Sequence, residues 1–194
     1  MAGRPKIFDE QAVIDKATEV FWLKGYEASS ADELLEAMGI GKGSFYLAFK
    51  GGKKELYERS LEQFSQKAME KLRKDLAATG DPLELVRDFF LSIADSKKAN
   101  HEKGCYMVNA INEMGAVDSR LQAKAIQLLQ VLEKVFTDVI REAQKNKQLL
   151  TKEKPELIAR SLITLWSGIN ITRRMYPDAR QLKQLIALQL DVLK

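Results

Sequence analysis

Residues 30–49 read SADELLEAMGIGKGSFYLAF, a run in which two short helical patterns flank a glycine-rich turn. Ser30 and Glu33 have the S-x-x-E spacing of a capping box, which starts a helix by satisfying its free amides. Gly39 ends that helix, because glycine adopts the left-handed conformation that closes a helix at little cost. The second helical pattern follows directly, so the run predicts a helix-turn-helix motif at about residues 30–49.

The second helix of this motif, expected at residues 42–49, has two different faces. Three apolar residues at helical spacing are expected to pack inside: Phe45, Ala48 and Phe49. The opposite face carries a cation, a glycine and two residues that suit a base edge: Lys42, Gly43, Tyr46 and Leu47. Such a face fits phosphates and bases in a DNA major groove. An ordinary core tyrosine beside solvated lysines is the alternative that remains open.

Apolar residues recur at helical spacing along the whole chain, without a convincing strand pattern. Prolines and glycines fall between the apolar stripes, as they do at helix ends. The pattern predicts nine helices, at residues 9–24, 30–38, 42–49, 53–78, 82–98, 104–114, 118–146, 155–173 and 178–193. We therefore expect an all-α protein with a helix-turn-helix domain at residues 1–52 and a helical bundle at residues 53–194.

Composition excludes several classes of protein. The 194 residues carry 31 Lys and Arg against 27 Asp and Glu, a net charge of +4 that is compatible with nucleic acid. One cysteine and one histidine exclude an intrachain disulfide, a cysteine-cluster metal site and a conventional hydrolytic relay. No apolar run approaches the roughly 20 residues of a bilayer span, and the N-terminus lacks a secretory signal. We expect a cytoplasmic protein that is not an enzyme, does not associate with a membrane and binds no metal or cofactor.

Two segments carry a resemblance to a known family: VFWLKGYEASS at residues 20–30 and GKGSFYLAF at residues 41–49. Over about the first 60 residues the chain resembles the N-terminal domain of TetR/AcrR transcriptional regulators. The resemblance implies a homodimer that binds a palindromic double-stranded DNA operator, usually as a repressor. It also implies that the C-terminal bundle binds a small-molecule effector, whose identity the sequence does not give. An activator is equally compatible with the sequence.

The expected DNA contacts are Arg4, Ser30, Lys42, Gly43, Ser44, Tyr46, Leu47, Lys53 and Lys54. The resemblance places contacts at the starts of the three helices after the first, and in the middle of the third. The stretch after Phe49 is one residue longer than usual, so either Lys53 or Lys54 matches the last of these positions. We expect the cations to neutralise phosphates, and Tyr46 with Leu47 to read or abut bases. Gly41 departs from the Ser or Thr that is common in the family.

The C-terminal part offers weaker signals. The last two predicted helices are apolar on more than one face, so we expect them to form the homodimer interface. The alternative is that other helices of the same chain bury these apolar faces. Six residues are candidates for lining an effector cavity: Phe89, Phe90, Met107, Asn109, Trp166 and Asn170. Simple core packing is the alternative for each. An all-helical binding protein or enzyme that ignores DNA is the alternative for the whole chain.

Cys105 is a candidate redox sensor. It follows Gly104 at a predicted helix start, where amide dipoles and nearby positive charge are expected to favour its thiolate. Some TetR-family members with a similar Gly-Cys pair respond to electrophiles or oxidants through that cysteine. A small buried hydrophobe is the alternative, because that is the usual role of a free thiol. Together with His101 it provides too few ligands for a metal site.

Overall fold

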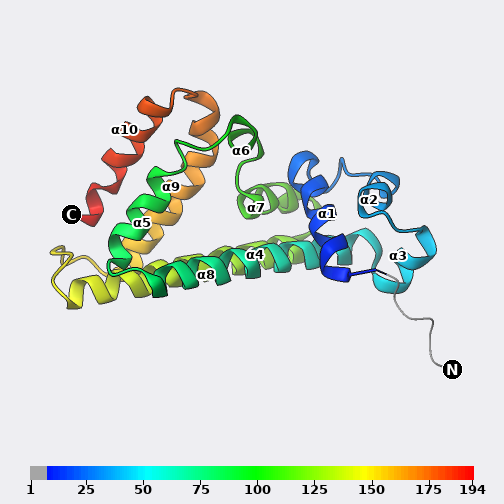
Figure 1. The fold of residues 1–194 in the computed structure, drawn as a ribbon, viewed down its shortest axis with the longest axis horizontal. Coiled ribbons are helices and arrows are strands. Elements are labelled where there is room, and N and C mark those ends of the chain that lie inside the picture. Colours follow the sequence, from blue (N-terminus) through cyan, green and yellow to red (C-terminus); the bar gives the residue numbers. More distant parts are fainter. Residues whose placement is uncertain (1–7) are drawn as a thin grey trace. The chain divides into compact units, whose positions relative to one another are not determined.

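The structure, a computed structural model, describes residues 8–194, and its regular elements are all helical (Figure 1). They are α1 Glu10–Lys24, α2 Ala31–Met38, α3 Lys42–Ala48, α4 Gly52–Ala78, α5 Pro82–Leu91, α6 Lys98–Lys103, α7 Tyr106–Val117, α8 Ser119–Lys145, α9 Pro155–Met175, α10 Ala179–Gln189 and the 3-10 helix η1 Leu190–Leu193. The expected all-α fold is confirmed. Arg4 lies outside the described residues.

The described chain divides into two compact units. Unit 1 holds the residues up to Ala68 together with Asn109–Leu128, and unit 2 holds Met69–Val108 together with Leu129–Lys194. Unit 1 therefore contains α1 to α3, the first part of α4, most of α7 and the first part of α8. A functional boundary at residue 52 stays a prediction, since packing joins later segments to the N-terminal helices.

The helices of the N-terminal motif begin and end as their capping residues predict. The Asp9 side chain accepts a hydrogen bond from the Gln11 amide at 2.9 Å and caps α1. Ser30 and Glu33 form the predicted capping box of α2, with both reciprocal bonds present. Gly39 closes α2 in the left-handed conformation, with φ of 70°. Local sequence thus fixes the limits of α2 to within one residue.

Several aromatic side chains pack together in unit 1. Phe21 of α1 packs edge-on against Tyr57 of α4, with 4.9 Å between ring centroids. Tyr26, just after α1, lies at the same distance from Tyr57. Phe49 closes α3 and is fully buried, with the Arg59 guanidinium over its ring. These contacts hold α1 and α3 against the first turns of α4.

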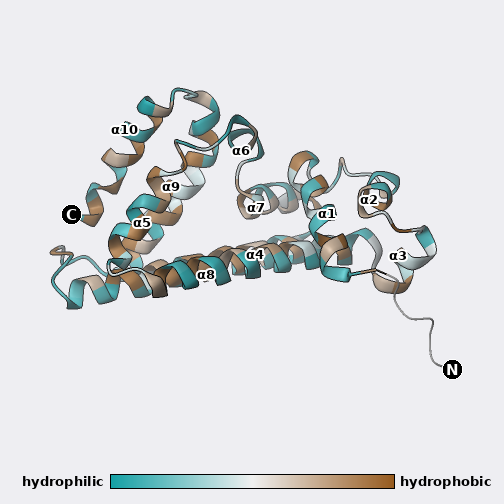
Figure 2. Ribbon diagram, viewed as in Figure 1, coloured by the Kyte–Doolittle hydropathy of each residue, from teal (hydrophilic) through white to brown (hydrophobic). Residues whose placement is uncertain are grey.

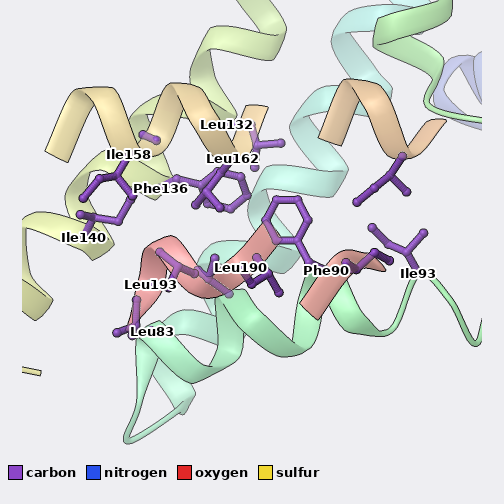
Figure 3. Packing of buried hydrophobic residues seen from close by; sticks show 14 of the residues in the cluster. Leu83, Phe90, Ile93, Leu132, Phe136, Ile140, Ile158, Leu162, Leu190 and Leu193 are labelled. Atoms are coloured by element: carbon purple, nitrogen blue, oxygen red, sulfur yellow. The ribbon is translucent and has the colours of Figure 1, made fainter. Parts of the chain in front are cut away.

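A second core fills unit 2 and joins α5, α8, α9 and α10 (Figure 3). Its largest buried side chains include Phe90 and Phe136, whose ring centroids lie 5.7 Å apart. The labelled residues around them are aliphatic: Leu83, Ile93, Leu132, Ile140, Ile158, Leu162, Leu190 and Leu193. Hydrophobic and hydrophilic residues both occur along the helices, as expected for helices with one buried face (Figure 2). None of the helices within residues 8–194 is long and apolar enough to cross a membrane.

The helix predicted at residues 82–98 is wrong in its second half. Helix α5 ends at Leu91, residues 92–96 form successive turns, and a separate short helix, α6, follows. The turns use i to i+3 hydrogen bonds, such as that from the Ala94 amide to the Leu91 carbonyl at 3.2 Å. Ile93 and Ala94 are both buried, so the apolar pattern continues while the backbone tightens. Periodicity alone does not separate these two cases.

Candidate DNA-binding interface

Helix α3 presents the two faces that its sequence predicts. Phe45 and Phe49 are buried, whereas Tyr46 is 50% and Leu47 80% exposed. Lys42, Gly43 and Ser44 are exposed as well. The inner face anchors the helix and the outer face is left to solvent, so the division is confirmed while contact with DNA stays a prediction.

The glycines of α3 leave open space above the helix. A Cβ atom placed on Gly41 or on Gly43 would meet no heavy atom within 4 Å. The protein's own packing therefore does not require glycine at either position. Gly41 also offers no side-chain acceptor to the first amides of α3, as expected where a hydroxyl is missing. At these two glycines another molecule can approach the backbone closely.

Tyr46 is neither a core residue nor a freely moving one. Its ring packs edge-on against Phe45, with 5.0 Å between centroids. A Cβ on Gly52 would lie 3.8 Å from its Cε1 atom, so the turn before α4 borders the ring. One side of Tyr46 is thus supported while half of the residue remains accessible, which favours the interface interpretation over the core alternative.

Ser30 is exposed but its hydroxyl is already engaged. It accepts from the Glu33 amide at 3.2 Å and donates to Glu33 Oε2 at 3.1 Å. Lys24 forms an ion pair with the same carboxylate. The hydrogen bond from Lys24 and those from Ser30 lower the pKa of Glu33 to about 2. The established role of Ser30 in this structure is to start α2, and its contact with DNA stays a prediction.

The two lysines at the start of α4 are both engaged within unit 1. Lys53 lies over the ring of Tyr26, 4.5 Å from its centroid, and donates to the Glu27 carbonyl at 3.4 Å. Lys54 pairs with Asp118, and this bond is the main reason that the pKa of Asp118 is lowered. Both lysines already have partners within the protein. To contact a phosphate, either lysine must share its present partner with the phosphate or release that partner.

Glu113 of α7 supports the helix-turn-helix motif and was missed from the sequence. Its carboxylate accepts hydrogen bonds from the backbone amides of Tyr26 and Glu27, each at 2.9 Å. Gly25, with φ of 85°, lies so close that a Cβ there would be 2.9 Å from both carboxylate oxygens. Glu113 thereby fixes the turn between α1 and α2. No local pattern reveals this, because the partners are 86 and 87 positions away.

Comparison with known proteins identifies this architecture. Residues 13–60 match the family described as bacterial regulatory proteins, tetR family, and residues 82–188 match tetracyclin repressor-like, C-terminal domain. The chain belongs to the TetR family. It is therefore a DNA-binding transcriptional regulator with an N-terminal helix-turn-helix domain and a C-terminal helical domain, and this family is one of regulators and not of enzymes.

Individual TetR-family relatives are similar over different shares of the chain. The repressor ComR of Escherichia coli K12 is 34% identical over 109 residues, which are 55% of this chain and 51% of ComR. The repressor DhaR of Mycobacterium sp. GP1 is 23% identical over 94% of this chain and 91% of its own. A structure of CifR cysteine mutants, solved with 26-bp double-stranded operator DNA, has a TM-score of 0.79 at 24% identity, over 98% of this chain and all of that one.

Five of the six effector candidates of this TetR-family protein lie in unit 2. Phe89 stacks on Trp166 with 5.2 Å between centroids, and Phe90 lies edge-on to the same indole. Asn170 is buried and donates to the Trp166 carbonyl at 2.6 Å. Met107 is also buried, whereas Asn109 belongs to unit 1. These contacts favour the core alternative for the aromatic residues, and effector binding by the set stays a prediction.

Cys105 corrects one expectation about its thiol. The amides of Val108 and Met107 and the charge of Arg173 do act on the sulfur, as predicted for a helix start. Burial has the larger effect, however, and raises the pKa of Cys105. The thiol form is therefore favoured and the expected thiolate is wrong. Whether an oxidant or electrophile reaches Cys105 stays a prediction.

Proposed function

We propose that this TetR-family regulator is a repressor that binds a palindromic operator as a homodimer and leaves it when a small-molecule effector binds. The observation that carries this function is the outer face of α3, which is exposed and polar or small at its start while its inner face is fixed by Phe45 and Phe49. The names of ComR and DhaR as repressors support the sign of regulation. The CifR complex supports double-stranded operator DNA as the partner.

Each expected DNA contact has a role set by its chemistry. Lys42 neutralises a phosphate at the edge of the major groove, as would Arg4, which lies outside the described residues. Tyr46 offers a hydroxyl to a base or phosphate, and Leu47 suits a thymine methyl. Gly43 lets the DNA backbone approach, and Ser30, Ser44 and one of Lys53 or Lys54 add polar contacts. Such an interface acts in the cytoplasm, where a bacterial operator lies.

The dimer interface is proposed on α9 and α10. A groove of about 710 Å³ runs between these helices, lined by Leu157, Leu165, Leu185 and small residues such as Gly168. Leu157 and Leu188 remain more than half exposed, although most of the predicted apolar residues of the two helices are buried in their own chain. A second copy of this chain would cover the remaining face and form a four-helix contact. Two recognition helices would then reach successive major grooves, about 34 to 36 Å apart.

Release of the operator is proposed through unit 2. An effector bound there more tightly in one conformation than in another shifts the regulator away from DNA. Reaction of Cys105 with an electrophile or oxidant is a second proposed signal. Because its thiol is buried with a raised pKa, this reaction requires an opening of unit 2 that exposes the sulfur.

The experiment is a salt-titrated selection of random duplex DNA by the purified protein, with and without thiol reductant. We expect a palindrome, whose half-site spacing reports the dimer, and an affinity that falls steeply with salt. Release without reductant and retention with it would support sensing by Cys105. Failure of the reduced dimeric protein to enrich any sequence at low salt would overturn the function.

Lys42→Ala tests the interface itself. The slope of log affinity against log salt should fall by about one for each protomer, since one phosphate contact is lost on each. Lys16→Ala is the matched control, because Lys16 is also an exposed lysine of a helix in unit 1 but lies on α1. If the two variants have the same affinity and slope as the wild type, α3 does not face DNA as proposed.

A further inference from the structure

Arg173, in the last turn of α9, is a buried cation with an incomplete set of partners. Only 7% of the residue is exposed. One guanidinium nitrogen donates to Asn170 Oδ1 at 2.8 Å, and Nε is buried without any hydrogen-bond partner. A neutral amide does not balance its charge, and burying a charge without a counterion costs a great deal of free energy.

The described residues 8–194 supply no counterion for Arg173. Within residues 8–194 no carboxylate forms an ion pair with it, and its pKa is lowered chiefly by burial. Cys105 lies near enough to interact with its charge, but burial raises the pKa of that thiol and keeps it neutral. Among the described residues the charge of this guanidinium is therefore left without a counterion.

A cavity of about 530 Å³ opens beside this guanidinium within unit 2. It lies between the turns after α5, helix α6 and the connection from α9 to α10, and Arg173 and His101 both line it. His101 Nε2 is buried and also without a partner, while Nδ1 lies 3.4 Å from the Arg173 carbonyl. Two unsatisfied polar groups thus belong to one cavity.

The acidic residues of the cavity rim are already paired. Glu102 lies 3.7 Å from Lys98, and Asp95 lies 3.2 Å from Lys183. Arg174, the remaining charged residue of the lining, donates to the His101 carbonyl at 3.5 Å. The rim acids therefore do not neutralise the interior, and the uncompensated positive charge lies at Arg173.

We propose that this cavity binds a small organic carboxylate, with the carboxylate on the Arg173 guanidinium. A guanidinium matches the planar geometry of a carboxylate, and a single buried cation balances a monoanion better than a phosphate dianion. Ala94, Pro177 and Ala179 add apolar lining for a hydrocarbon part. His101 Nε2, which has no partner among the described residues, offers a second hydrogen-bonding position, and this favours an acid with a hydroxyl group.

The proposed site names a class of effector and so deepens the proposed function. As a signal for release from DNA it rests on that function, whereas binding of the carboxylate does not. It uses α6 and the loop between α9 and α10, which the six sequence candidates leave out. The turns after α5, where sequence periodicity predicts a continuous helix, form one wall of the cavity.

The first experiment measures thermal shift and calorimetric binding on the full-length protein without DNA. The probes are propionate, butyrate, lactate, 2-hydroxybutyrate and benzoate, each beside its own amide. At least one acid should raise the melting temperature. Its amide should bind at least about tenfold more weakly, because the charge-assisted hydrogen bonds are lost. The 2-hydroxy acids should bind more tightly than the acids of the same chain length without the hydroxyl group. A panel in which no acid binds, or in which acids and amides bind alike, overturns the proposal.

Variants then locate the binding. Arg173→Met keeps a long apolar side chain and should weaken the acid by about tenfold or more, while Arg173→Lys should keep part of the affinity. Arg180→Met is the matched control, since Arg180 is an exposed arginine on α10 outside the cavity lining. Its affinity for the acid should equal that of the wild type. Unchanged binding in folded Arg173→Met would overturn the site.

A final measurement separates this site from the proposed function. The acid that binds is added to the protein on its selected operator, and release should follow with the same dependence on Arg173. If no DNA sequence is selected but the acid binds through Arg173, the proposed function fails and the site stands. If the operator is bound and no acid binds, the site fails and the function stands.

Discussion

The turn after α1 and the cavity beside Arg173 differ in how well the hydrogen-bonding groups of a charged side chain are satisfied. At the turn, both oxygens of Glu113 accept backbone hydrogen bonds at 2.9 Å, and Gly25 leaves just enough room for them. At the cavity, Arg173 has one neutral partner and an orphaned Nε. The satisfied carboxylate fixes a turn, whereas the unsatisfied guanidinium lies where we propose that a carboxylate binds.

Gly25→Ala should produce the largest loss of stability, because it attacks the satisfied cluster. The backbone at Gly25, with φ of 85° and ψ of 173°, lies in a region that only glycine adopts readily. The new Cβ would also displace Glu113 from its two amides. We expect a loss of about 3 kcal/mol in the free energy of unfolding, measured by urea denaturation.

Gly39→Ala is the control for that measurement. Gly39 also has positive φ, but a Cβ there meets nothing within 4 Å. It should therefore cost about 1 kcal/mol, which is the penalty of the left-handed conformation alone. Equal losses for the two variants would show that the contact between Gly25 and Glu113 has no energetic weight.

Glu113→Ala should cost about 2 kcal/mol, since it leaves the amides of Tyr26 and Glu27 without their charged acceptor. It should also weaken operator binding, because the turn that leads into α2 loosens. In the double variant Gly25→Ala, Glu113→Ala the loss should be smaller than the sum, as the new methyl group then has space. A strictly additive result would contradict the clamp.

Arg173→Met should raise the free energy of unfolding, and this change should be smaller than the losses expected at Gly25 and Glu113. Without a bound anion it removes an uncompensated buried charge, so we expect a gain of about 1 kcal/mol, or about 2 to 4 °C in melting temperature. The exposed Arg180→Met should leave the melting temperature unchanged. A clear loss of stability for Arg173→Met would mean that Arg173 is a structural residue and that the two regions do not differ as described.

The two regions also differ in how far the sequence predicts them. The capping box of α2 and the two faces of α3 depend on residues within a few positions of one another, so local spacing predicts them correctly. Glu113 is 87 positions from Tyr26, and the His101 ring meets the Arg173 carbonyl across 72. Arg173 looks in sequence like any cation in the last turn of a helix. Its burial arises only when α6 and α9 pack together.

The break after α5 has the same cause. Periodicity follows which residues are buried, and Ile93 and Ala94 are buried in turns as they would be in a helix. Polar residues such as Asp95 and Ser96 then form part of the cavity instead of a helix surface. Long-range packing therefore decides the part of the protein where we propose that the effector binds.

Glu33 should show the smallest effect, because it is satisfied like Glu113 but exposed to solvent. Its pKa is about 2, lowered first by the hydrogen bond from Lys24, and the value in the unfolded chain is near 4.3. Since the folded pKa is the lower one, the contribution of Glu33 to stability is complete above about pH 4.5 and is lost as pH falls through 2. NMR titration of its carboxyl carbon measures this directly.

Glu33→Gln keeps the capping box but removes the ion pair with Lys24. At pH 7 it should change the free energy of unfolding far less than Glu113→Ala does, as water already screens an exposed pair. The Glu33-dependent part of the acid transition should disappear in this variant. Glu33→Gln could instead destabilise the protein as much as Glu113→Ala does. Solvent exposure would then not determine how much a hydrogen-bonded charge contributes to the free energy of unfolding. The contrast between Glu113 and Arg173 would then have to rest on hydrogen-bond geometry and not on burial.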